Sequence, residues 1–90
     1  MRRIFTQKNM EAFKTYLEPD EIIDILWPKR ILTERQYQEL QSLSADMTKA
    51  EYLWSLMRQK KRYLDGVRQA LVETQQLGSH GVLVGLLQYD

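Results

Sequence analysis

The stretch LDGVRQALVET, residues 64–74, has the clearest periodicity in the chain and indicates its structural class. Apolar side chains recur from Leu64 to Val67 and onward every three or four residues, which is the spacing of one helix face. Strand signals are weak, because β-branched residues are scattered and the one Asp-Gly pair, Asp65-Gly66, lies inside this helical pattern. The sequence therefore predicts an all-α protein.

Two helices are expected before residue 30. The first covers Ile4 to Leu17, but the polar residues 7–9 interrupt its apolar stripe and predict a kink or two half-helices. The second begins near Pro19, whose fixed φ suits the first helical turn. Pro28 should end this helix at about Trp27, since proline cannot continue it.

Capping signals divide the rest of the chain. The segments TERQ at 33–36 and TKAE at 48–51 read as capping boxes that open a third and a fourth helix. The helix over 64–74 is the fifth. Gly78 predicts that the fifth helix ends at a glycine with a left-handed backbone conformation. Ser79 is then expected to cap a sixth helix.

The fourth predicted helix carries an unusually wide apolar arc. At about 100° per residue, its apolar side chains cover roughly half of the circumference. That is wider than the usual core-facing stripe. The helix is therefore either central to the core, or buried on one side with an exposed apolar edge that can bind a partner. The residues of this arc are Ala50, Tyr52, Leu53, Trp54, Leu56 and Met57.

Composition limits the class of protein. The 90 residues suit one domain, residues 1–90, with a formal net charge of +1. There is no cysteine, which excludes disulfides and thiolate metal sites, and no apolar run reaches the about 20 residues that span a bilayer. His80 is the only histidine, and no catalytic relay surrounds it in the sequence. We expect no enzyme, cofactor, metal site or membrane partner.

Charge is segregated along the chain. Four acids occur within residues 18–24 and four bases within residues 58–62. These groups predict either solvated helix ends that complement helix dipoles or two docking surfaces of opposite sign.

Five segments carry a resemblance to a known family. They are EIIDIL at 21–26, RILTERQYQEL at 30–40, KAEYLWSL at 49–56, ALVETQQ at 70–76 and VLVGLL at 82–87. In this order they resemble the caspase recruitment domain (CARD), a branch of the death-fold superfamily. The resemblance implies a six-helix antiparallel Greek-key bundle whose first helix is kinked or split. One departure is QKKR at 59–62, where many members have an Arg-Gly pair between the fourth and fifth helices.

The resemblance also implies a function and a set of interface residues. CARDs bind other CARDs in apoptotic, inflammatory and innate-immune signalling in the cytoplasm. The implied partners are CARD-containing caspases, adaptors or receptors, or further copies of the chain in a helical filament. The implied acidic face comprises Glu18, Asp20, Glu21, Asp24 and Glu39, and the basic face comprises Arg2, Arg3, Lys49, Arg58, Lys60, Lys61 and Arg62.

Two alternatives remain open at this level. The basic run 58–62 could contact phosphates in a small helical nucleic-acid-binding domain, although the near-neutral net charge argues against this. The chain could also be a CARD-only inhibitor that presents one face and caps a growing assembly.

Overall fold

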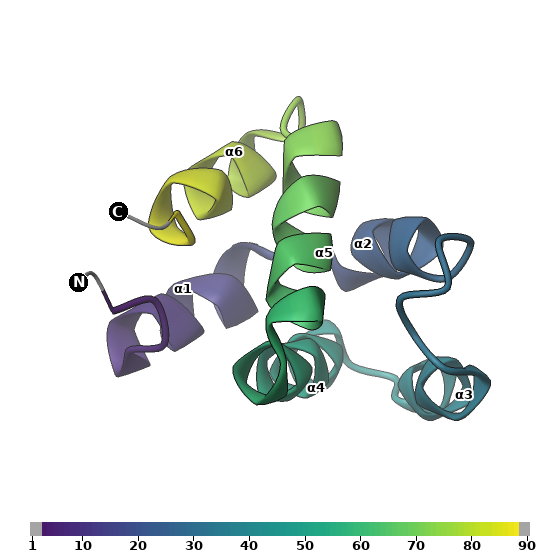
Figure 1. Cartoon of the computed structure of the whole chain (residues 1–90). Coiled ribbons are helices and arrows are strands. Elements are labelled where there is room, and N and C mark those ends of the chain that lie inside the picture. Colours follow the sequence, from purple (N-terminus) through teal and green to yellow (C-terminus); the bar gives the residue numbers. More distant parts are fainter. Residues whose placement is uncertain (1–2, 89–90) are drawn as a thin grey trace.

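The chain forms six helices and no strand within residues 3–88, the part that the computed structural model describes (Figure 1). The predicted all-α class is confirmed. The described residues have a radius of gyration of 12.0 Å. The helices are α1 (Gln7–Tyr16), α2 (Pro19–Leu26), α3 (Glu34–Ser42), α4 (Asp46–Gln59), α5 (Lys61–Glu73) and α6 (Gly78–Leu86).

The first helix is uninterrupted, so the expected kink or split is wrong. α1 begins at Gln7, where the polar residues were expected to break it. Thr6 is its N-cap and accepts a hydrogen bond from the backbone N–H of Asn9. The Asn9 side chain donates to the carbonyl of Ile4, 2.8 Å away. Thr6 therefore starts the helix by accepting from one of its free N–H groups, and Asn9 ties the preceding Ile4 to the first turn.

The proline and capping signals around α2 and α3 give correct boundaries. Pro19 is the first residue of α2, and Trp27 is its C-cap, directly before Pro28. The Thr33 side chain accepts from the backbone of Gln36, whose own side chain accepts from the backbone of Thr33. This reciprocal pair is the predicted capping box.

Three other capping predictions are wrong, and one of them is Ser79, which is the second residue of α6 rather than its N-cap. α4 begins at Asp46, two residues before Thr48, and the Thr48 hydroxyl donates to the carbonyl of Ala45 rather than capping a helix. Gly78 opens α6 instead of stopping α5, and no glycine among residues 3–88 has a positive φ. The chain reverses through a turn in which Leu77 donates to the carbonyl of Thr74, so no left-handed residue is needed.

α4 and α5 form the centre of the bundle. α4 packs against α1, α2 and α5, and α5 also packs against α2 and α6 (Figure 1). The wide apolar arc of α4 is therefore explained by its central position, with Leu53 and Met57 almost fully buried. Even Leu56, at the edge of the arc, is buried.

α3 lies at the edge of the bundle (Figure 1). Leu40 is its only buried residue. Its other attachments are side chains at its surface: the Tyr37 ring stacks on Trp27 at a centroid distance of 4.4 Å, and the Gln36 amide donates to the Tyr63 hydroxyl at 3.0 Å. α3 is thus held by one apolar anchor and a few aromatic and polar contacts.

Gly66 allows the α2–α3 connection to approach α5 closely. A Cβ at this position would lie 2.8 Å from Ile31 Cδ1 and 3.3 Å from Leu26 Cδ2. We expect Gly66→Val to lower the free energy of unfolding by about 1–3 kcal/mol through overpacking. Gly85→Val is the matched control, because nothing lies within 4 Å of a Cβ there. Equal effects of the two substitutions in chemical denaturation would contradict this account.

Candidate functional site

Carboxylates from two helix starts meet on one surface. Glu18, Asp20 and Glu21 at the beginning of α2 line a shallow hollow together with Asp46, the first residue of α4. Asp24 is exposed one turn further along α2, on the same side as Asp20. We call these five residues the acidic surface. Asp46 was not predicted, because it lies far from the others in the sequence.

Part of this acidic charge is neutralised within the molecule. Lys49 Nζ lies 2.9 Å from Asp20 Oδ1, and only 11% of the Lys49 side chain is exposed. Lys49 was expected on the basic face, but it lies in the first turns of α4, beside the acidic surface. The remaining acidic residues keep this surface negative overall, because Glu18, Glu21, Asp24 and Asp46 are all exposed.

Four of the seven predicted bases gather at the corner between α4 and α5. Lys60 is both the C-cap of α4 and the N-cap of α5, so a single extended residue joins the two helices. Arg58 lies in the last turn of α4, and Lys61 and Arg62 begin α5. All four side chains are exposed.

Arg62 connects this corner to the loop after α2. Its Nη2 donates to the carbonyls of Arg30 and Ile31, at 3.2 Å each. Arg30 has a φ of 59°, an unusual left-handed backbone for a non-glycine residue. Arg62 thus holds a strained turn, and it brings the exposed Arg30 beside the corner. We call Arg30, Arg58, Lys60, Lys61 and Arg62 the basic surface.

The helix dipole does not account for all of these bases. Arg58 suits the negative C-terminal end of α4, as expected for a solvated helix end. Lys61 and Arg62, however, lie in the first turn of α5, where the dipole disfavours cations and where no side-chain cap is present. Their positions therefore favour a role other than stabilising α5.

Of the remaining predicted interface residues, Glu39 lies apart from the acidic surface. Glu39 on α3 accepts hydrogen bonds from the Tyr52 hydroxyl and from Arg35 Nε, and these bonds lower the pKa of the Glu39 carboxyl. Burial, together with the hydrogen bond to Glu39, raises the pKa of Tyr52 to about 12. Glu39 lines a hollow between α3 and α4, not the acidic hollow. Arg3 is exposed before α1, and Arg2 lies outside the described residues.

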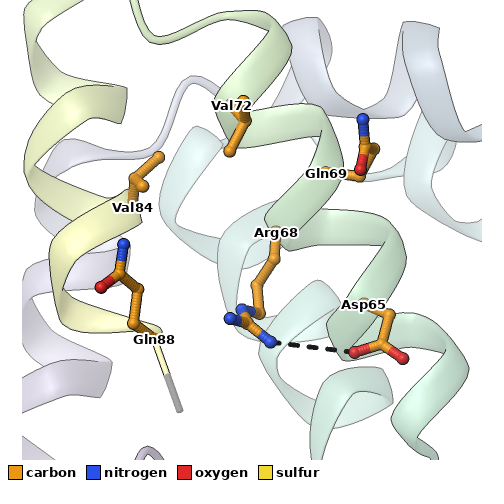
Figure 2. Close-up of a pocket in the computed structure, with 6 residues that line it drawn as sticks. All are labelled: Asp65, Arg68, Gln69, Val72, Val84 and Gln88. Atoms are coloured by element: carbon orange, nitrogen blue, oxygen red, sulfur yellow. Dashed lines mark ion pairs between the residues drawn. The ribbon is translucent and has the colours of Figure 1, made fainter. Parts of the chain in front are cut away.

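The surface between α5 and α6 has a different character. Figure 2 shows Val72 and Val84 facing this groove, with Gln69 and Gln88 at its rim. Asp65 and Arg68 pair across one helical turn, 3.9 Å apart. These residue types form neither a nucleophile–base pair nor a set of metal ligands.

Within residues 3–88 no group of three or more histidine or carboxylate side chains is placed to hold a metal ion. None of the described helices combines the length and the apolar character that crossing a bilayer requires.

Comparison with known proteins adds no further assignment. No protein-family model, curated protein or solved structure matches the chain.

Proposed function

We propose that the chain is a CARD-type protein–protein interaction module that docks its acidic surface on the basic surface of another CARD. In this proposal the six helices adopt the antiparallel Greek-key arrangement of the death fold. The packing of α1 against α4 and α6, and of α2 against α5, supports that arrangement. The proposed setting is a cytoplasmic apoptotic or inflammatory signalling assembly, with caspase, adaptor or receptor CARDs as partners.

The observation that carries the proposal is the separation of charge along α4. Asp46 begins this helix and Arg58 lies twelve residues later, so at 1.5 Å per residue the two are about 18 Å apart. The acidic surface surrounds the first end and the basic surface the second. Surfaces of opposite sign at opposite ends of one rigid helix suit a head-to-tail contact, which can repeat in a filament.

The energy of such a contact must come from several interactions together. An exposed ion pair contributes about 0–1 kcal/mol, so one pair cannot hold two domains together. The four acids of the acidic surface other than the paired Asp20, together with the exposed bases of the basic surface, allow a network of pairs. We expect association to weaken as the salt concentration rises, because salt screens exposed charges.

Charge reversal tests the two surfaces separately. We expect Asp24→Lys or Arg58→Glu to weaken association about tenfold. Each substitution removes an attraction of about 0.5–1 kcal/mol and adds a repulsion of similar size. Association is measured by light scattering of the chain alone and by titration with other CARDs. The double variant Asp24→Lys/Arg58→Glu exchanges the charges at these two positions and should recover self-association if they face each other across the contact.

Controls separate this interpretation from a general effect of charge. Glu11→Lys makes the same charge change as Asp24→Lys at an exposed position of α1, outside both surfaces, and should leave association unchanged. Thermal denaturation confirms that each variant is folded. The proposal is wrong if the wild type binds neither itself nor any CARD, or if the two single reversals have no effect. Salt-sensitive binding to duplex DNA or RNA would instead favour the nucleic-acid alternative.

A further inference from the structure

His80 joins three parts of the fold. It lies on α6 and is fully buried, with no exposed surface. Its Nε2 lies 2.9 Å from the backbone N of Glu18, in the turn between α1 and α2. Its Nδ1 lies 2.6 Å from the hydroxyl oxygen of Thr74, the C-cap of α5. One imidazole ring thus connects the start of α6 to two other chain segments.

The partners of the ring fix its protonation state. A backbone N–H can only donate, so Nε2 must accept from Glu18 and carries no proton. The Thr74 hydroxyl donates to the carbonyl of Ala70 at 2.9 Å, so its oxygen accepts from Nδ1–H. Both contacts therefore require a neutral His80 that is protonated on Nδ1.

The surroundings of the ring contain few charged groups. Burial lowers the pKa of His80, while the nearby carboxylates of Glu18 and Glu21 act in the opposite direction. α6 carries no ionisable residue apart from His80. On the α5 side the ring meets the neutral hydroxyl of Thr74, and the neighbouring Glu73 pairs with Lys29.

We propose that His80 is a pH-sensitive latch whose protonation releases the α1–α2 turn from α5 and α6. A proton on Nε2 places a second donor against the Glu18 N–H, so the hydrogen bond is lost and two N–H groups oppose each other. Glu18 belongs to the acidic surface, so the released turn also displaces part of that surface. The latch itself does not depend on the proposed CARD function.

The direction of the pH dependence follows from the lowered pKa. The unfolded chain takes up a proton on His80 near pH 6.5, while the folded chain resists it. The contribution of neutral His80 to the free energy of unfolding is complete above pH 6.5. It is lost as the pH falls toward the pKa of His80 in the folded chain. Between pH 7.5 and 5.5 the folding equilibrium constant should fall by up to about tenfold from this group alone.

Nuclear magnetic resonance of the wild-type chain tests the proposal directly. We expect the ring nitrogens of His80 to show the Nδ1–H tautomer at neutral pH and to titrate below pH 6.5. As the ring titrates, hydrogen exchange at the Glu18 amide should accelerate. An Nε2–H tautomer, a folded-state pKa at or above 6.5, or an unchanged Glu18 amide would overturn the latch.

A substitution provides the second test. His80→Gln keeps an acceptor oxygen close to the position of Nε2 and cannot gain a proton. The variant should therefore lose the stability change between pH 7.5 and 5.5 that the wild type shows in chemical denaturation. Equal pH dependence of the two proteins would overturn the proposal. If the variant does not fold, the measurements on the wild-type ring decide alone.

Discussion

Replacing Phe13 by alanine is expected to lower the free energy of unfolding by about 3–5 kcal/mol, a large part of the total for a domain of this size. Phe13 is fully buried on α1, and its ring lies 5.2 Å from that of Trp54 on the central helix α4. Its removal leaves a cavity where α1 meets α4. At about 4–8 °C per kcal/mol, the melting temperature should fall by roughly 12–40 °C.

Phe5 provides a matched control for this substitution. Its ring also lies 5.2 Å from Trp54, but Phe5 precedes α1 and is 38% exposed. Phe5→Ala deletes the same atoms beside the same partner, yet solvent can fill the space. We expect it to cost less than half as much as Phe13→Ala in chemical denaturation. Similar losses for the two variants would contradict the expectation that the burial of Phe13 sets the cost of its removal.

Leu40→Ala is expected to detach α3 while the other helices remain folded. Leu40 is the only buried residue of α3, and truncating a buried leucine costs about 2–5 kcal/mol. The stack of Tyr37 on Trp27 and the hydrogen bonds from Gln36 to Tyr63 and from Tyr52 to Glu39 are then the main contacts left to hold the helix. If the stability lost in Leu40→Ala exceeds the free energy by which α3 docks on the bundle, the form with α3 detached becomes the main populated state.

Hydrogen exchange distinguishes detachment from global unfolding. In Leu40→Ala the amides of α3 should exchange at nearly unprotected rates, while those of α5 remain protected. Leu53→Ala on the central helix α4 is the control, since Leu53 is 1% exposed and its loss should reduce protection throughout. Equal loss of protection in α3 and α5 of Leu40→Ala would mean that α3 is an integral part of the core.

Local signals in the sequence predicted helix boundaries correctly where contacts within a few residues determine them. Pro19, Pro28 and the Thr33–Gln36 box define their boundaries through contacts within a few residues. The box expected at 48–51 failed because the helix already starts at Asp46, whose charge suits its N-terminus. The stop expected at Gly78 failed because the turn after Glu73 needs no left-handed residue.

The candidate surfaces were predicted in outline and not in detail. Charge clusters adjacent in sequence, such as 18–24 and 58–62, remain adjacent in space because each lies near one helix end. The pairs Lys49–Asp20 and Arg62–Arg30 join residues 29 and 32 positions apart. Helical periodicity does not specify which helices become neighbours, so these pairs became visible only in the folded chain.

Because Lys60 alone joins α4 to α5, the length of α4 fixes which face of α5 points to the interior. An extra residue placed there would turn α5 by about 100° relative to its present register, carrying Leu64 and Val67 away from the interior. The segment between Leu26 and Glu34 is longer and irregular, so it can absorb an insertion. Natural variation in chain length should therefore collect after α2 and spare this joint.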